Sequence, residues 1–334
     1  LSDLENSQFI LSASYLDLGI KVNNYSGGSG TGVKDAGEEA LVPAIYFATP
    51  INEELTFGFS VTTPFGLGTK YDPESRVAET AVDSTIITHN FNPSLSYKVN
   101  DKLALAIGAQ AQYYKATLSQ MFNSELAKSH GSDWGYGYNL GLTFKPTETI
   151  KLGVGYRSKI DHKVEGTSNI PAASYRGAMT LNTTTPESID AGISYKINDK
   201  TTIAYDLIWN RWSRVNELRV KNQGLTDTVT VTDWKDSFMH AIGVDHKATE
   251  KLTLRAGTAF EKEAITRTNI EPRIPVGDRY WASAGFNYKL SNGFSVDASY
   301  VHQFFQDVNI TANSATGTYK TTVDVYSFAL KKDF

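Results

Sequence analysis

The sequence predicts an all-β protein, a 14-stranded antiparallel transmembrane β-barrel. Three features predict it: a short polar turn sequence that recurs six times, alternating apolar and polar residues on both sides of each turn, and aromatic residues beside the turns. Successive turns begin 42 to 51 residues apart. A period of this size indicates a repeated supersecondary unit, here a strand, a variable loop, a second strand and a tight turn.

The turns determine the expected number of strands. Each turn joins two strands, so six turns account for twelve strands. One more strand fits before the first turn, at about residues 8–22, and another after the last loop, at about residues 319–334. The total is therefore fourteen. The turns span residues 50–55, 98–103, 145–150, 196–201, 247–252 and 289–294.

The segments beside the turns alternate with a period of two residues. After the second turn, Leu103 and Ile107 lie on one face, and Gln110 and Gln112 lie on the other. This alternation indicates strands with one apolar and one mostly polar face. The segments exceed ten residues, which is enough to cross a bilayer at a tilt. An even strand number, with short turns at one end and longer loops at the other, is typical of a bacterial outer-membrane barrel.

Aromatic residues recur where a barrel carries its interfacial girdle. Four of them stand beside the turns and three open one strand, and ordinary strand propensity is the alternative explanation. They are Tyr97, Phe144, Tyr195 and Tyr288 beside the turns, and Trp134, Tyr136 and Tyr138 in the strand.

Composition narrows the classes of protein. The chain has no run of 18 or more apolar residues, so no transmembrane helix is expected, and its lack of cysteine excludes a disulfide framework. No signal peptide is recognisable, so the chain is expected to be a mature or trimmed form. The net charge of −4 gives no reason to expect nucleic acid as a partner. The uninterrupted repeat favours one transmembrane barrel domain over residues 1–334.

Proline interrupts the third expected strand. Every strand of a closed barrel is central, and proline, which has no N–H to donate, is nearly confined to edges and bulges. Gly66 is expected to tolerate the unusual backbone of a bulge. We therefore expect the ladder to break at Pro64, Phe65 and Gly66 and to leave a gap in the wall. A bulge near the rim without functional consequence is the alternative.

An apolar cluster is expected inside the barrel, in the half away from the turns. A porin for sugars or ions needs a polar interior, whereas apolar side chains would shelter a hydrophobic ligand from water. Packing against an inserted loop or plug is the alternative. The alternation points these ligand-binding candidates inward: Ile208, Trp212, Met239, Trp281, Val301 and Phe305.

Several segments, in order along nearly the whole chain, resemble the FadL/TodX family of outer-membrane transporters of long-chain fatty acids and hydrocarbons. The resemblance implies passive uptake of a hydrophobic small molecule through a fourteen-stranded barrel, with lateral exit through a kink in the third strand at Pro64, Phe65 and Gly66. The matching segments are residues 62–68, 91–94, 212–214, 234–236 and 274–281, together with the terminal Phe334.

The chain departs from this family in three places. The family's N-terminal hatch is either missing or trimmed, because the first strand follows Leu1 closely. The loop after the fifth strand is expected to be short, at about residues 119–133. The basic pair linked to carboxylate binding falls near Gln120 and Thr230, neither of which is basic. This last departure favours a neutral hydrophobic compound over a fatty acid.

The preferred interpretation of the charged residues that point inward is that they pair with one another across a polar lumen. The alternative is that Arg157 or Lys159 binds the carboxylate of a ligand, and Gln120 is a further candidate polar contact. The other charged residues expected to point inward are Lys151, Asp206, Arg255 and Asp297.

Catalysis is not expected. The six histidines lie in six different elements or rims without metal-ligand spacing, and nucleotide-binding and zinc-finger patterns are absent. We therefore predict no catalytic residues, no metal site and no cofactor. The expected location is the outer membrane of a bacterium, as a monomer in contact with outer-membrane lipid and lipopolysaccharide. A general diffusion porin for hydrophilic solutes is the main alternative function; an outer-membrane hydrolase and a structural or adhesive barrel are two others.

Overall fold

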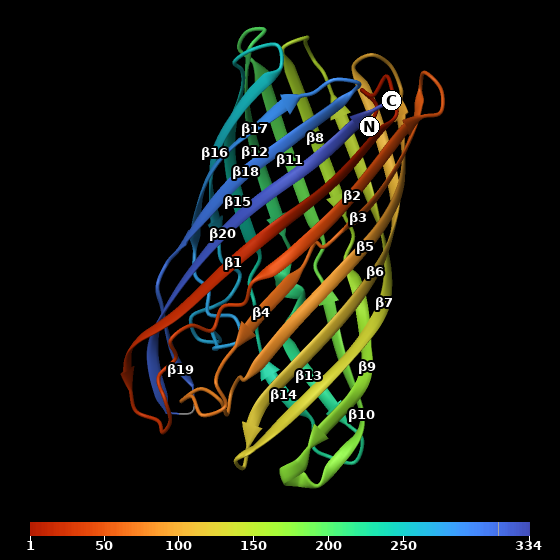
Figure 1. The fold of residues 1–334 in the computed structure, drawn as a ribbon. Coiled ribbons are helices and arrows are strands. Elements are labelled where there is room, and N and C mark those ends of the chain that lie inside the picture. The colour runs from red at the N-terminus through yellow and green to blue at the C-terminus, as the bar shows by residue number, and fades with distance from the viewer. Residues whose placement is uncertain (313) are drawn as a thin grey trace.

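A computed structural model describes residues 1–312 and 314–334. Its strands form one antiparallel sheet that closes on itself, because β1 pairs with β20 along most of their length. Figure 1 shows β1 (red) beside β20 (blue) in the wall of the barrel. The strand segments are β1 (Gln8–Ser26), β2 (Ala40–Pro50), β3 (Leu55–Thr62), β4 (Gly66–Lys70), β5 (Asp83–Lys98), β6 (Leu103–Phe122), β7 (Glu125–Phe144), β8 (Ile150–Arg157), β9 (Ile160–Ile170), β10 (Tyr175–Thr185), β11 (Ser188–Lys196), β12 (Thr201–Asn210), β13 (Glu217–Asn222), β14 (Thr228–Val231), β15 (Ser237–Lys247), β16 (Leu252–Lys262), β17 (Arg279–Lys289), β18 (Phe294–Phe305), β19 (Val308–Ala312) and β20 (Ala315–Asp333).

These 20 segments make 14 barrel strands, because six of the strands are each interrupted once. The interrupted strands are β3 with β4, β8 with β9, β10 with β11, β12 with β13, β14 with β15, and β18 with β19. The predicted fold class is confirmed. Two three-residue 3-10 turns, η1 (Pro171–Ala173) and η2 (Trp212–Arg214), are the helical segments of the described chain. None of its helices is long and apolar enough to cross a membrane.

The six predicted turns all lie at the end of the barrel that holds both termini (Figure 1). Their third residue explains why the sequence recurs. In the second turn, the side-chain Oδ1 of Asn100 accepts hydrogen bonds from the N–H groups of Lys102 and Leu103, both at 2.9 Å. Asn52 and Asn198 do the same in their turns. A short polar side chain that bonds the backbone ahead of it favours a turn over a continued strand.

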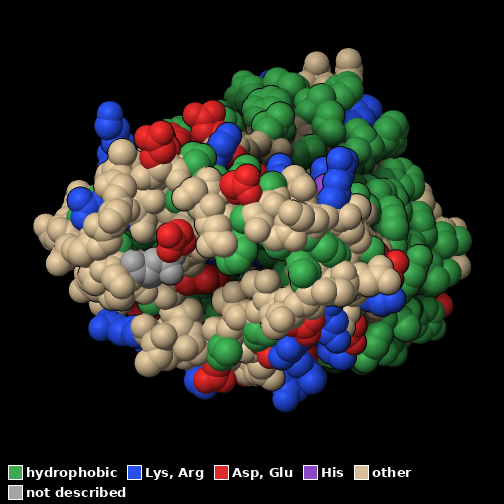
Figure 2. Space-filling view, turned by 90° about the horizontal axis from the view of Figure 1, so that it is seen from below, with side chains coloured by type: hydrophobic (Ala, Val, Ile, Leu, Met, Phe, Trp, Pro, Cys, Tyr) green, Lys and Arg blue, Asp and Glu red, His purple; other side chains and the backbone are tan. Residues whose placement is uncertain are grey.

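The outer wall is apolar. Large hydrophobic side chains such as Leu105, Ile107 and Tyr136 are exposed on it, and the aromatic residues predicted for the girdle are all exposed as well. Seen from the loop end, hydrophobic side chains gather along one flank of the wall, whereas polar and charged side chains cover most of the end itself (Figure 2). An apolar band on such a barrel is the surface that faces lipid. Pairing of β1 with β20 leaves the sheet without a free terminal edge.

Three loops interlock at the end opposite the turns, and we call residues 27–39, 71–82 and 263–278 the loop cap. Their apolar side chains share a buried cluster with β1, β19 and β20. The Tyr71 hydroxyl donates to the carbonyl of Pro272 at 2.5 Å, and Thr321 of β20 donates to the carbonyl of Pro275 at 2.9 Å. The loop cap is therefore packed and hydrogen-bonded onto the barrel wall rather than extended into solvent.

Two sequence expectations need correction. Residues 119–133 are not a loop, because β6 and β7 continue as one long hairpin joined by Asn123 and Ser124. Both of these residues have positive φ values, 49° and 64°, as a two-residue hairpin turn of this hand requires. Gly66 does not have a positive φ and begins the regular segment β4, so its conformation is not what interrupts the strand.

Candidate transport site

The third barrel strand is interrupted between β3 and β4, and we call residues 63–65 the bend. Pairing of this strand with β2 ends where Ile45 lies opposite Val61. The next bridge on this side joins Thr69 to Gly37, which lies in the loop before β2. On the other side, β3 and β4 both pair with β5. Over the described residues the wall therefore lacks backbone pairing on one side of the third strand, next to Pro64.

Thr88 of β5 holds the bend in place of a regular ladder. Its hydroxyl accepts a hydrogen bond from the N–H of Phe65 at 3.0 Å and donates to the carbonyl of Phe65 at 2.7 Å. The N–H of Thr88 also donates to this carbonyl at 3.2 Å. Proline has no N–H to donate, so one side chain supplies contacts that the backbone at Pro64 cannot make.

Aromatic rings connect the bend with the opposite side of the barrel. The ring of Phe65 meets the ring of Trp212 edge to face, with centroids 5.6 Å apart. Trp212, in η2, meets Trp234 in the same way at 5.4 Å. Edge-to-face pairs at these distances are stabilising. The structure thus brings together one residue predicted for the opening, Phe65, and one predicted for ligand binding, Trp212.

The other ligand-binding candidates lie close together through the strand register. Ile208 pairs with Met239 across β12 and β15. Trp281 pairs with Gln303 of β18. On the same face of β18, Phe305 lies two pairs further from the turns and Val301 lies two pairs nearer to them. All are partly buried, and they share a face with polar lumen residues rather than with the exposed apolar residues of the outer wall.

The sequence reading missed a charged pair inside this apolar cluster. The guanidinium of Arg279 lies 5.4 Å from the ring centroid of Trp281 and 5.3 Å from that of Phe305. Arg279 also makes an ion pair with Glu261, with Nη2 and Oε1 2.7 Å apart. Glu261 is itself paired with Met239 in the register. The two-residue spacing between Arg279 and Trp281 could have revealed that both share a face.

The candidate polar contacts lie apart from one another and from this cluster. Arg157 donates to Gln110 Oε1 at 2.6 Å inside the barrel. Lys159 is exposed and donates to its neighbour Asp161 at 2.6 Å. Gln120 accepts a hydrogen bond at 2.8 Å from an arginine of the loop cap. Of the two charged candidates, Arg157 is therefore the one whose charge lies within the barrel interior.

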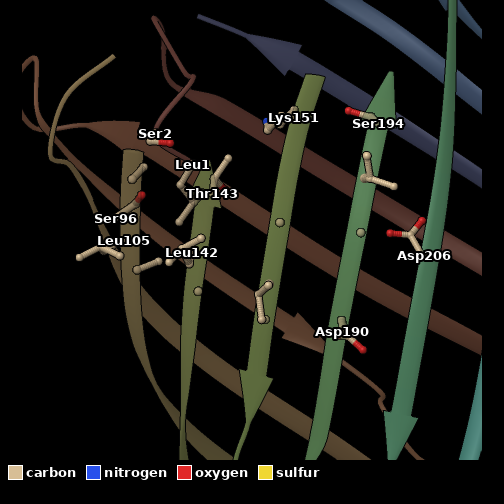
Figure 3. A pocket seen from close by; sticks show the side chains of 18 of the residues that line it. Leu1, Ser2, Ser96, Leu105, Leu142, Thr143, Lys151, Asp190, Ser194 and Asp206 are labelled. Atoms are coloured by element: carbon tan, nitrogen blue, oxygen red, sulfur yellow. The ribbon is translucent and has the colours of Figure 1, made fainter. Parts of the chain in front are cut away.

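A cavity of about 410 Å³ opens inside the barrel near the turns. Small residues line much of it, including Gly153 and Gly155, and the carboxylates of Asp190 and Asp206 project from β11 and β12 (Figure 3). These carboxylates, together with Lys151, distinguish the cavity from the aromatic cluster of the other half.

The segment before β1 is attached beside this cavity. The carboxylate of Asp3 makes ion pairs with Lys145 at 2.5 Å and with Lys151 at 2.7 Å. Burial raises the pKa of the Asp3 carboxyl, but hydrogen bonds from the two ammonium groups outweigh this effect and lower it to about 2. Asp3 is therefore ionised at neutral pH.

The described residues contain no cluster of three or more histidine or acidic side chains that could hold a metal ion. One hydrogen-bonded constellation stands on the outer wall: Asp324 accepts from the Tyr300 hydroxyl at 2.5 Å and lies 2.6 Å from His302 Nδ1. It includes no serine or other ordinary nucleophile. The geometry suits an interfacial polar patch beneath exposed aromatic rings.

A closed antiparallel barrel with an apolar outer wall, short turns at one end and longer loops at the other defines an integral outer-membrane barrel protein. The family model described as "Outer membrane protein transport protein (OMPP1/FadL/TodX)" matches residues 1–333. The chain therefore belongs to the OMPP1/FadL/TodX family.

Individual relatives agree with this assignment. The long-chain fatty acid transport protein of Salmonella typhi is 26% identical, over 90% of this chain and 79% of the relative. A FadL homologue from Pseudomonas aeruginosa superposes with a TM-score of 0.92 at 25% identity, covering 100% of this chain and 91% of that chain. The Pseudomonas putida toluene transporter TodX has the same fold, with a TM-score of 0.77 at 17% identity, covering 100% and 92%.

Membership of this family establishes the general function of the protein. The family consists of outer-membrane transporters of hydrophobic compounds, and not of enzymes. The predicted outer-membrane location and the predicted family are confirmed. The general porin alternative is not favoured.

Proposed function

We propose that this protein is a passive uptake channel in which a hydrophobic small molecule binds at the apolar cluster and leaves sideways through the wall at the bend. The observation that carries the proposal is the missing backbone pairing between β2 and the third strand beside Pro64. Relatives named for long-chain fatty acid and toluene transport support a hydrophobic cargo.

The proposed binding position combines the six apolar candidates near Trp212 and Trp281. Burying a hydrocarbon chain gains about 0.8 kcal/mol per methylene, so a ten-carbon chain gains several kcal/mol before ordering costs are subtracted. Arg279, lying over Trp281 and Phe305, adds a cation that is already paired with Glu261. This pairing favours neutral cargo, since a free carboxylate would compete with Glu261.

The proposed route couples binding to exit through one contact. A ligand that inserts at Trp212 displaces the ring of Phe65, which rests on it. The bend then stays attached through the hydrogen bonds between Phe65 and Thr88 and through a side-chain hydrogen bond between Thr63 and His89. A segment with few backbone bonds opens at lower cost than a regular ladder, and the bend is such a segment.

Two glycine variants distinguish lateral exit from passage straight through the barrel. A Cβ at Gly66 would have Ile86 O, 3.7 Å away, as its nearest neighbour, and a Cβ at Gly153 would meet nothing within 4 Å. An added Cβ therefore clashes with nothing at either position. Gly66 borders the bend, whereas Gly153 lines the cavity near the turns.

Uptake of radiolabelled decane by Gram-negative cells that lack their own hydrocarbon transporter is the measurement. Gly66→Trp is expected to abolish uptake, and Gly153→Trp is expected to leave it unchanged. The reverse pattern would show that cargo passes through the turn end of the barrel. A large steady ion current through the wild-type protein in a planar bilayer, without decane uptake, would favour a porin.

The outer wall is proposed to contact outer-membrane lipid and lipopolysaccharide as a monomer. Its exposed apolar band supports lipid contact, because such a surface is unstable in water. Mass measurement of the protein in lipid nanodiscs tests the monomer, and co-purification of lipopolysaccharide tests the lipid partner.

A further inference from the structure

Asn90 of β5 is a buried amide without a partner. The residue has 0% relative exposure, and neither its Oδ1 nor its Nδ2 has a hydrogen-bond partner among the described residues. Buried polar side chains nearly always have partners, and an unsatisfied amide is costly. A leucine, which has a similar branched shape, would avoid this cost, so the amide at this position calls for an explanation.

The position of Asn90 connects it with the bend. In the register it lies opposite Thr62, the last residue of β3. Two residues away on the same face of β5, Thr88 holds Phe65. Asn90 is thus the polar group beside the unpaired part of the wall, directly next to the segment that is proposed to move.

Neighbouring amides on the same face are already used. Gln112, opposite Asn90 on β6, places its Oε1 3.0 Å from both His162 Nε2 and Thr185 Oγ1. Asn92 donates to the carbonyl of Ala109 at 2.5 Å. The neighbouring amides therefore have hydrogen-bond partners of their own. The Asn90 amide is left available to a partner that is not part of the wall.

We propose that Asn90 is a polar binding position at the lateral exit, which takes the single oxygen of an otherwise apolar, uncharged cargo molecule. A hydroxyl would donate to Oδ1, and a carbonyl would accept from Nδ2. A pure hydrocarbon satisfies neither group. This inference rests on the proposed lateral exit and adds a substrate class to it: neutral hydrophobic alcohols, phenols, aldehydes and ketones.

The chemistry of the position selects against charge. The amide is neutral, and so are the polar side chains beside it in the register: Thr62, Thr88, Asn92 and Gln112. An ionised carboxylate would lose its hydration there without gaining a cation. A site built to bond one oxygen discriminates against the analogue that lacks it more strongly than an apolar site discriminates by size.

The test compares decan-1-ol and decane as probes of the full chain in detergent micelles, by equilibrium dialysis of the radiolabelled compounds. Asn90→Leu is expected to weaken decan-1-ol binding about tenfold, the contribution of one hydrogen bond, and to leave decane binding unchanged. Asn222→Leu is the matched control, because Asn222 is also buried with an unpartnered Oδ1 but lies in β13. It is expected to change neither probe.

Four outcomes would overturn the proposal. Equal loss of both probes in Asn90→Leu would show damage to packing, and an unchanged affinity for decan-1-ol would show that the amide has only a structural role. Asn90→Ala, which adds no bulk, repeats the comparison if the leucine variant does not fold. If the wild-type protein binds decane but shows no preference for decan-1-ol, the Asn90 proposal fails alone; if it binds neither probe, the proposed function fails with it.

Discussion

Arg273 illustrates how single side chains hold the loop cap on the barrel. It is buried, and its guanidinium donates to Ser84 Oγ at 2.9 Å, to Gln120 Oε1 at 2.8 Å and to the carbonyl of Thr80. One residue therefore joins loop 263–278 to β5, to β6 and to a second loop. Arginine suits this role because its planar group presents five donors in fixed directions.

Replacing Arg273 by methionine is expected to release the loop cap. The change leaves buried acceptors without donors, which costs about 3 kcal/mol. Amide hydrogen exchange of residues 71–82 should speed up by about two orders of magnitude, while exchange in the barrel strands stays slow. Arg267→Met, at an exposed position of the same loop, is the control. Unchanged exchange in Arg273→Met would contradict the role assigned to the guanidinium.

Asp3 gives a second residue-scale prediction, on pH. Its pKa is lowered from 3.8 to about 2. A carboxyl with a depressed folded-state pKa stabilises the folded state fully above its unfolded pKa, and this contribution disappears as the pH falls through the folded pKa. The stabilisation by Asp3 is therefore lost as the pH falls from about 4 to about 2. Because the group is largely exposed, solvent screening limits the contribution to about 1 kcal/mol.

Asp3→Asn removes this contribution at pH 7. Thermal unfolding in detergent should show a small loss of stability relative to the wild-type protein at pH 7, and the difference should vanish near pH 2. Limited proteolysis should also cleave before β1 faster in the variant. A difference that persists at pH 2 would mean that the ion pairs with Lys145 and Lys151 are not its source.

At the scale of elements, the repeated turns explain the even spacing of the strands. In five of the six turns the third residue is asparagine or threonine, and its side-chain oxygen accepts hydrogen bonds from two backbone N–H groups ahead of it. The sixth turn uses positive φ values at Asn292 and Gly293 instead, 57° and 74°. Different local chemistry thus produces the same reversal of the chain.

Asn100→Ala is expected to weaken the turn between β5 and β6. Both side-chain hydrogen bonds to the backbone are lost, at a net cost of about 1 kcal/mol. Urea unfolding in lipid vesicles measures the change. Asn100→Asp keeps the accepting oxygen and should stay close to the wild-type stability; an equal loss in both variants would contradict the turn argument.

At the scale of the whole molecule, alternation assigns each strand residue to lipid or lumen. Ile107 of β6 is 60% exposed on the outer wall, whereas its neighbour Ala106 lines the inner cavity. Ile107→Arg places a charge in the lipid-facing band and is expected to cost about 2 to 4 kcal/mol. Ala106→Arg should cost much less, because the lumen can hydrate the charge.

The measurement is urea-dependent folding of the two variants into lipid vesicles. A larger loss for Ala106→Arg than for Ile107→Arg would mean that the faces of β6 are reversed, as a register slip of one residue would cause. The assignment of residues 1–334 to a single domain stays a prediction, and one cooperative unfolding transition in this experiment would support it.

The amino-acid sequence by itself determined the barrel. The turns, the strand count and the lipid-facing residues depend on local features, namely side chains that bond their own backbone and a two-residue alternation. The interruption of the third strand at Pro64 could also be predicted, because the missing N–H of proline is a local property. Hairpin turns with positive φ in residues such as Asn123 and Ser124 leave a weaker signal, so the range 119–133 was misread as a loop.

Only the tertiary structure decided how distant segments meet. The contact of Phe65 with Trp212, the arginine between Trp281 and Phe305, and the amide of Asn90 left without a partner depend on strands that are far apart in sequence. Alternation shows which way a side chain points, but not what lies across the lumen from it. That depends on closure of the sheet, which sets the register of all strands together.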